Sequence, residues 1–314
     1  MNQEQNNLKK SEKSEKSEKI ENIVLSGGGI KGLAQLGALQ ALFSDSSINQ
    51  KQIKRFVGSS VGGLICFFLS IGYNCEEIIE IYNSINWKKM QEFNWDDILD
   101  KWGICSFSPL IQNVLIWLNK RGIHSGITFL QHYKLFENML VLTGTNLTME
   151  RLEYFNYEST PDMRIIDALR ITMNYPLIYP PFKLNNCLYV DGAMMAPYPI
   201  TFISDVNINE TTIGLFLGTD IYTDDKQKLI NNQTNGLLDY MKLIINCIYN
   251  RYCSQEYKEY RECTCQIDCS DVYSMDFDLD LKTKETLINI GKESMINSSP
   301  WCRLLLNKPE QDSP

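Results

Sequence analysis

Residues 22–42 read NIVLSGGGIKGLAQLGALQAL, and this stretch sets the start of the fold. An apolar strand-like run gives way to glycines and then to apolar residues at helical spacing, which predicts a strand, a tight loop and a helix. Gly27, Gly29 and Gly32 also stand in the G-x-G-x-x-G register of a dinucleotide-binding turn. The loop is therefore a candidate for holding a pyrophosphate or another negative charge that develops during a reaction.

The composition is that of a globular protein with a sizeable core. The chain has 314 residues, of which 44% are apolar and 22% are charged. A net charge of -8 and a pI near 5.0 argue against a general nucleic-acid binder and against purely electrostatic docking on anionic lipid, because both need a basic surface. The first residues lack the apolar core of a secretory signal, and no apolar run approaches the length of a membrane span. We therefore expect a cytoplasmic protein.

The ten cysteines are expected to stay thiols in such a reducing compartment. One cluster stands out, formed by Cys253, Cys263, Cys265 and Cys269. Its C-x-C and C-x3-C spacings differ from the paired C-x2-C of a zinc ribbon. Free thiols are the favoured interpretation of the cluster, and metal binding is the lesser alternative.

Along the chain, strand-like and helical segments alternate. Residues 1–20 carry SEKSEKSEK, which has no apolar face and predicts a disordered charged tail. Residues 21–300 contain no internal repeat and no linker, so we expect one domain there and a second tail over 301–314. Within the domain, strands are predicted near 53–60, 139–148, 151–157 and 211–219, and helices over 61–85, 109–122, 161–174 and 236–252. This order is typical of an α/β architecture with a parallel sheet.

The dinucleotide interpretation makes a further demand that the sequence does not meet. A dinucleotide site needs an acidic residue at the end of the second strand, roughly 20 residues beyond the glycines. That strand ends as FVGSS, and Asp45 lies earlier, in the connection before the strand. The fingerprint is incomplete where the ribose would bind.

A different turn stands at the end of the second strand. Gly58-Ser59-Ser60-Val61-Gly62 is a G-x-S-x-G sequence between a predicted strand and a predicted helix. This context is typical of a nucleophile elbow, in which small neighbours allow a sharp turn that exposes the serine hydroxyl at a helix N-terminus. The helix dipole favours negative charge on that oxygen.

The glycine loop and the elbow are expected to meet. The carboxyl ends of neighbouring parallel strands converge on one crevice, so the amides of Gly27, Gly28 and Gly29 can face Ser60. Acyl transfer needs such amides, because its tetrahedral intermediate carries a full negative charge on the former carbonyl oxygen. The sequence therefore favours an oxyanion at this loop, with a bound phosphate as the weaker alternative.

The motifs GGGIKG, GSSVG and DGA, the last at Asp191-Gly192-Ala193, resemble in this order the three motifs of the patatin-like phospholipase family. The segment DALRITMNYPLIYPPF is similar to the one that precedes the catalytic aspartate in that family, and ETLINIGKESM is similar to its helix near the end of the domain. The resemblance covers most of residues 22–296. It implies a three-layer α/β/α fold with a mainly parallel central sheet.

The resemblance also implies an activity. A member of this family would be a calcium-independent lipid acyl hydrolase of the phospholipase A type that needs no cofactor, with Ser60 as nucleophile and Asp191 as its base. The resemblance implies an oxyanion hole formed by Gly27, Gly28 and Gly29. It places Lys31 where the family has Arg or Lys. The remaining motif glycines are Gly32, Gly58, Gly62 and Gly192. The implied partners are a phospholipid or other acyl-lipid substrate and, transiently, a membrane surface, but no nucleic acid.

Several alternatives stay open. Val61 stands where the family often has a smaller residue, and MMAPYP replaces an Asn-containing turn, which bears on substrate range and loop shape. Asp191 can also be read as the first residue of an Asp-Gly turn, and Lys31 as packing for the loop. A thioesterase or neutral-lipid lipase would share the Ser/Asp pair. A non-catalytic nucleotide- or lipid-binding module would keep the glycine loop and have no use for Ser60.

The remaining aromatic and histidine residues carry weaker signals. Trp87, Trp95, Trp102 and Trp117 could form a lipid-facing lid, although core packing is the favoured role for most of them. His124 and His132 lie in no recognisable motif.

Overall fold

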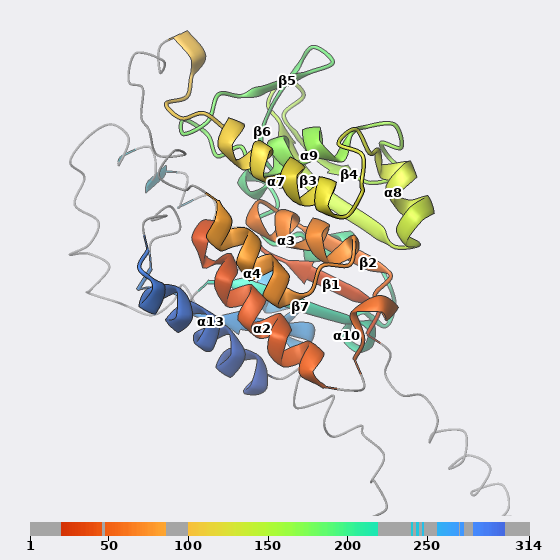
Figure 1. Ribbon diagram of the computed structural model, residues 1–314, viewed down its shortest axis with the longest axis vertical. Coiled ribbons are helices and arrows are strands. Elements are labelled where there is room, and N and C mark those ends of the chain that lie inside the picture. Colours follow the sequence, from red (N-terminus) through yellow and green to blue (C-terminus); the bar gives the residue numbers. More distant parts are fainter. Residues whose placement is uncertain are drawn as a thin grey trace, which may run out of the picture.

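The fold is built on one mixed sheet with helices on both faces (Figure 1). The computed structural model describes residues 20–45, 48–85, 100–218, 240, 243–244, 247, 256–269, 271–272 and 279–298. Both predicted tails, except for Ile20, and nearly all of the helix predicted over 236–252 lie outside these residues, as do Trp87, Trp95 and Cys253. The boundaries expected at residues 20 and 300 stay predictions.

The sheet follows the order β5-β6-β3-β2-β1-β7-β8, with β4 on the other edge of β3. Its parallel part runs from β3 to β8, and β4, β5 and β6 extend it through antiparallel pairs. The strands are β1 (Asn22–Leu25), β2 (Arg55–Gly58), β3 (Met139–Asn146), β4 (Arg151–Phe155), β5 (Phe182–Leu184), β6 (Cys187–Asp191), β7 (Thr212–Leu217) and β8 (Thr264–Ile267). The predicted α/β fold is confirmed, with an antiparallel extension that sequence periodicity did not indicate.

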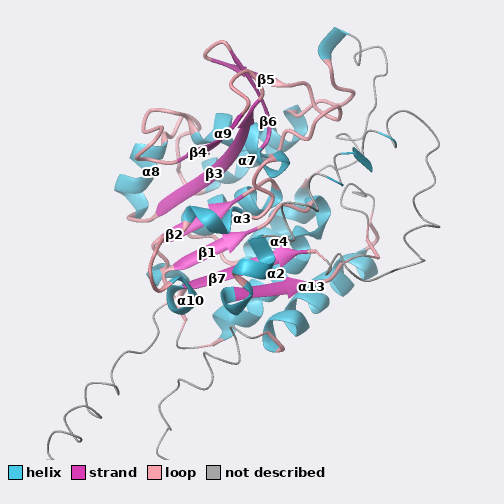
Figure 2. Ribbon diagram, turned by 180° about the vertical axis from the view of Figure 1, so that it is seen from behind, coloured by secondary structure: helices cyan, strands magenta, loops and turns pink. Residues whose placement is uncertain are grey.

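The helical layers on the two faces of the sheet are unequal (Figure 2). The longer helices are α2 (Gly32–Ser44), α3 (Val61–Ser70), α4 (Cys75–Ser84), α7 (Ser108–Lys120), α8 (Phe129–Phe136), α9 (Ile165–Thr172) and α13 (Leu281–Ile296). The shorter segments are α10 (Ile208–Thr211) and the 3-10 turns η1 (Gly29–Lys31), η2 (Gln50–Gln52), η3 (Gly192–Met194), η4 (Pro199–Phe202) and η5 (Arg261–Cys263). Of these, α2, α3, α9 and α13 pack on one side of the structure, whereas η4, α10 and η5 contact β1, β2 and β7.

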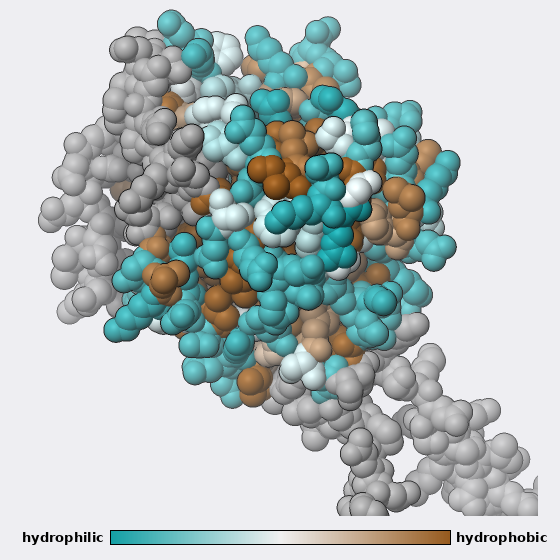
Figure 3. All heavy atoms as spheres, in the orientation of Figure 1, coloured by the Kyte–Doolittle hydropathy of each residue, from teal (hydrophilic) through white to brown (hydrophobic). Residues whose placement is uncertain are grey.

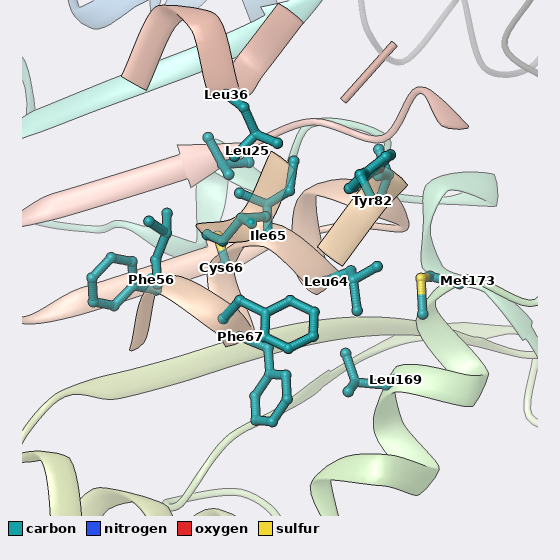
Figure 4. Close-up of a cluster of buried hydrophobic side chains, with 14 of the residues drawn as sticks. Leu25, Leu36, Phe56, Leu64, Ile65, Cys66, Phe67, Tyr82, Leu169 and Met173 are labelled. Carbon is teal, nitrogen blue, oxygen red and sulfur yellow. The ribbon is translucent and has the colours of Figure 1, made fainter. Parts of the chain in front are cut away.

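The apolar side chains that alternate along each strand feed two separate cores. Ile23 and Leu25 belong to the larger one, which is filled by the long helices, and Val24 between them belongs to the smaller one. Figure 4 shows α3 at the centre of the larger core, with Ile65 and Phe67 among side chains from β1, β2 and α9. Because α3 is buried all round, the residue that precedes it is held firmly in place.

Helices α2 and α13 approach each other unusually closely. A side chain at Gly37 would overlap the carbonyl of Ile288, and one at Gly291 would overlap the carbonyl of Ala34. The two glycines therefore allow backbone-to-backbone contact between the helix that follows the glycine loop and a helix near the end of the described chain.

One sequence expectation was wrong, and one strand had not been anticipated. The helix expected over 61–85 is two helices, because the chain turns at Gly72, whose φ is +89°, and restarts with a capping box at Asn74. Strand β8 was not predicted at all, since its sequence TCQI lacks a clear apolar alternation. Three members of the cysteine cluster lie in or beside this strand. Cys263, Cys265 and Cys269 are all buried, free thiols.

Figure 3 shows one face that is mostly hydrophilic, with hydrophobic side chains in small separate groups. Among the described helices, none is both long enough and apolar enough to cross a bilayer.

Candidate active site

The elbow after β2 places Ser60 at the N-terminus of α3. Ser60 has φ 52° and ψ -128°, a strained conformation for a residue with a side chain. Close packing around it explains the two flanking glycines. A Cβ on Gly58 would lie 2.5 Å from the carbonyl of Gly62, and one on Gly62 would lie 2.5 Å from the carbonyl of Leu25. The G-x-S-x-G pattern therefore lets α3 start directly against β1 and β2.

The long strand β3 brings Asp191 to this elbow. Strand β2 pairs with the first half of β3 and ends at Gly58, opposite Leu142. Strand β6 runs antiparallel along the second half of β3 and ends at Asp191, opposite Gly144. Because β4 occupies the other edge of β3, β2 and β6 follow each other along one edge, and their carboxyl ends meet. Two residues that are far apart in the sequence thus become neighbours.

The Ser60 hydroxyl donates a hydrogen bond of 2.7 Å to Oδ2 of Asp191. The other carboxylate oxygen, Oδ1, accepts from the amide of Ala193 at 2.8 Å. Asp191 is only 2% exposed, and this burial raises the pKa of its carboxyl to about 7, although both hydrogen bonds act in the opposite direction. A carboxylate with a pKa near neutrality can accept a proton from a hydroxyl far better than an ordinary one.

The glycine loop lies against the elbow, as expected from the sheet. A Cβ on Gly27 would lie 3.2 Å from the Cβ of Ser60. The Gly27 amide, however, donates to the carbonyl of Pro197 at 2.9 Å. Gly28 and Gly29 begin the turn that leads into α2, where the first amides have no partner within the helix. Of the described residues, none accepts a hydrogen bond from either of these two amides.

The other predicted motif residues surround this loop. Gly32 is the first residue of α2, and Gly192 is the first residue of η3, directly after Asp191. Lys31 ends η1, and its ammonium is partly buried. Burial lowers the pKa of Lys31, while Cys269, Asp268 and Asp271 raise it. The loop after β8 therefore surrounds the lysine with thiol and carboxylate groups.

Three residues that hold the pair in place were not identified from the sequence. The amide of Ser60 donates to Oγ1 of Thr172 at 3.1 Å, and the amide of Asp191 donates to the carbonyl of Asn174 at 2.9 Å. Thr143 donates to the neighbouring hydroxyl of Ser59 at 2.9 Å. The sequence RITMN places Thr172 and Asn174 at the end of an apolar helix, and such polar residues were the available signal for a supporting role. Their hydrogen-bond partners come from distant parts of the chain, so the role itself could not be predicted.

Both histidines have hydrogen-bond partners other than Ser60 and Asp191. His132 is buried, and its Nε2 lies 2.8 Å from Oγ of Ser70, at the opposite end of α3, which is about 15 Å long. Burial lowers the pKa of His132 to about 4. Nδ1 of His124 accepts from the amide of Gly126 within its own loop. His132 is therefore not positioned to serve Ser60, and the His124 ring is engaged within its own loop.

The dinucleotide alternative is not supported by the position of its acidic residue. Asp45 follows the last residue of α2, about 20 Å along this helix from the glycine loop.

The two described tryptophans differ from each other: Trp117 packs against the large core, and Trp102 is 51% exposed.

Comparison with known proteins gives a family and a fold for this chain. The family model for patatin-like phospholipase matches residues 23–203, which contain both Ser60 and Asp191. The fold is similar to that of VipD from Legionella pneumophila, with a TM-score of 0.55 at 14% identity over 91% of this chain and 67% of that one.

Two viral proteins are similar in sequence. The "Uncharacterized protein R571" of Acanthamoeba polyphaga mimivirus is 33% identical over 280 residues, which cover 87% of this chain and 92% of that one. The "Probable lipid hydrolase 463L" of Invertebrate iridescent virus 6 is 33% identical over 181 residues, which cover 57% of this chain and 61% of that one. Together with the ordered motifs and the fold, these matches show that the chain belongs to the patatin-like phospholipase family.

Proposed function

We propose that this protein is a calcium-independent lipid acyl hydrolase that cleaves acyl esters of phospholipids through a Ser60–Asp191 dyad. The observation that carries the proposal is the 2.7 Å hydrogen bond between the Ser60 hydroxyl and the buried Asp191 carboxyl. The family match and the relative named as a probable lipid hydrolase support a lipid substrate. The acyl-lipid substrate implies transient contact with a membrane surface.

In the proposed reaction, Ser60 Oγ attacks the ester carbonyl while its proton passes to Asp191. The amides of Gly28 and Gly29 stabilise the negative charge that forms on the carbonyl oxygen, assisted by the N-terminus of α3. Gly27 contributes by leaving room beside the Ser60 side chain. Asp191 then returns the proton to the departing alcohol, and a water molecule activated by the same carboxylate hydrolyses the acyl-enzyme.

An active-site-directed fluorophosphonate tests this proposal directly. We expect one equivalent to label Ser60, with loss of labelling in Ser60→Ala, because only an activated serine attacks the phosphorus. A panel of phospholipids, lysophospholipids, triglycerides and acyl thioesters, followed by mass spectrometry, then separates a phospholipase from a neutral-lipid lipase or thioesterase. Absence of labelling at Ser60 would point to a binding module instead.

The pH dependence of activity should report the ionisation of Asp191. Since the carboxylate form is the base and burial raises its pKa to about 7, kcat/KM should fall about tenfold per pH unit below this value and level off above it. The measurement is kcat/KM for an uncharged, water-soluble ester from about pH 5 to pH 9. A profile that stays flat through neutrality would contradict the role of Asp191 as base.

Chelation should leave activity intact. The proposed oxyanion donors are backbone amides, so charge stabilisation needs no cation. In the described part of the chain, no group of three or more His, Cys, Asp or Glu side chains is arranged to hold a metal ion. Phospholipid hydrolysis is expected to be the same with and without excess EDTA. Loss of activity that added calcium restores would show that the mechanism is wrong.

A further inference from the structure

A cavity of about 200 Å³ lies between the start of α7, the end of α9 and β5. These three elements lie together in both ribbon views (Figures 1 and 2). Its lining is mixed, with apolar residues such as Phe107 and Pro181 beside four polar ones, namely Arg170, Asn174, Ser106 and Ser108. In the reaction proposed above, none of the four takes part.

Arg170 supplies the positive charge of this cavity. Its guanidinium carbon lies 4.5 Å from the ring centroid of Phe182, which also lines the cavity. Stacking on an aromatic ring orients the planar guanidinium and leaves its N–H groups available at the edge. Within the described ranges, no carboxylate forms an ion pair with Arg170. A guanidinium held in this way is well suited to an anion with several oxygens, such as a phosphodiester.

The first turn of α7 also lines this cavity. It contains no acidic residue, and its N-cap residue, Phe107, makes no capping hydrogen bond with its side chain. The amide of Ser108 donates to Oγ of Ser106 at 3.2 Å, so the Ser106 hydroxyl keeps its own hydrogen for another acceptor. The start of α7 thus offers the Ser106 hydroxyl to the cavity that Arg170 also lines, and its Pro109 has no N–H to add.

The cavity and the dyad share a residue. Asn174 lines the cavity, and its carbonyl accepts the hydrogen bond from the Asp191 amide at 2.9 Å. Arg170 lies one helical turn before Asn174 and two residues before Thr172, which accepts from the Ser60 amide. In a glycerophospholipid, the phosphate is attached to the glycerol carbon next to the one that bears the sn-2 ester. The cavity that shares Asn174 with the dyad is therefore the candidate site for the phosphate of an ester bound at Ser60.

We propose that Arg170, supported by the start of α7, binds the phosphodiester of the phospholipid substrate and makes the enzyme prefer phospholipids to uncharged acyl esters. This inference rests on the proposed acyl hydrolase function. It assigns Arg170 a role in substrate binding and none in the chemical step.

The test compares a monomeric dihexanoylphosphatidylglycerol with dihexanoylglycerol, which has the same acyl esters and no phosphate. In R170Q, the ratio of kcat/KM for the phospholipid to kcat/KM for the diacylglycerol should fall at least about tenfold, mainly through KM. R170K should retain part of the preference, because it keeps the charge and loses the planar fork. K183Q is the matched control, since it removes one exposed positive charge from the residue next to Phe182 and should leave the ratio unchanged. An unchanged ratio in R170Q overturns the proposal.

Binding measurements show whether the site takes the phosphate of a lipid or free phosphate. They also test the role of Arg170 independently of the proposed acyl hydrolase function. On the S60A background, calorimetric titration should show that R170Q weakens binding of dihexanoylphosphatidylglycerol at least about tenfold. Inorganic phosphate should bind much more weakly to S60A than the lipid does; equal affinity would indicate a site for free phosphate and overturn the lipid assignment. If the wild-type protein hydrolyses neither ester and Ser60 is not labelled, the acyl hydrolase function fails. The S60A and S60A/R170Q titrations then still decide whether Arg170 binds the phosphodiester.

Discussion

Replacing Ser60 by Ala or Asp191 by Asn is expected to lower kcat by at least about a thousandfold, the scale of loss seen when a nucleophile or its base is removed. The first change removes the attacking oxygen. The second leaves an amide that cannot take the proton, although it can still accept the hydrogen bond from the Ala193 amide. The measurement is steady-state hydrolysis of a phospholipid by each purified variant.

Both variants should remain folded. The pKa of Asp191 is higher in the folded protein than in the unfolded chain, where it has the ordinary value of an aspartate. Stability therefore falls as the pH rises between these two values, because the unfolded chain releases this proton while the folded protein retains it. At about pH 8, the uncharged amide of Asp191→Asn avoids this cost, so we expect it to unfold at no lower temperature than the wild type.

The two histidines provide the control for this mechanism. His124→Gln and His132→Gln should each retain most of the activity per folded molecule, because His132 bonds to Ser70 and His124 bonds within its own loop. A loss of about a thousandfold in either variant would indicate a serine–histidine mechanism and a different assignment of the site.

Replacing Gly62 by Ala is expected to lower kcat by at least about a hundredfold. The added Cβ would lie 2.5 Å from the carbonyl oxygen of Leu25 and 2.6 Å from that of Ser26. Since backbone cannot yield as a flexible side chain does, α3 must move away from β1 and carry Ser60 with it. A displacement of about 1 Å is enough for a loss of this size.

Gly126→Ala is the matched control for Gly62→Ala, because its added Cβ would meet only the side chain of His124, at 3.1 Å. Steady-state kinetics and thermal unfolding of both variants make the comparison. Equal activity of Gly62→Ala and the wild type would show that the elbow tolerates a side chain there, against the packing described above.

The parts of the site that were predicted are those encoded by short, local patterns. The two glycine-rich turns follow their strands directly, so Gly27, Ser60 and the helices after them could be located from spacing alone. That the two turns meet followed from the geometry of parallel sheets. The choice of Asp191 needed more, namely the resemblance of its DGA motif to a family, because an Asp-Gly pair by itself indicates only a turn.

The parts that were not predicted depend on contacts between distant segments. Thr172 and Asn174 accept hydrogen bonds from the amides of Ser60 and Asp191, which strand pairing brings to them. No local sequence pattern predicts such partners. The Gly27 amide is taken by Pro197 for the same reason. The break between α3 and α4 was missed because apolar residues continue through it, although Gly72 turns the chain and Asn74 caps the next helix.

The position of β1 has a consequence for biosynthesis. It lies between β2 and β7, and its partner Thr212 in β7 comes 190 residues after Asn22. The helix that follows the glycine loop is in turn covered by α13, through the close contact at Gly37 and Gly291. A chain that is still being made on the ribosome lacks these late segments, and long-range pairing of this kind is slow. We therefore expect the loop that faces Ser60 to reach its folded geometry only after β7 and α13 have been made.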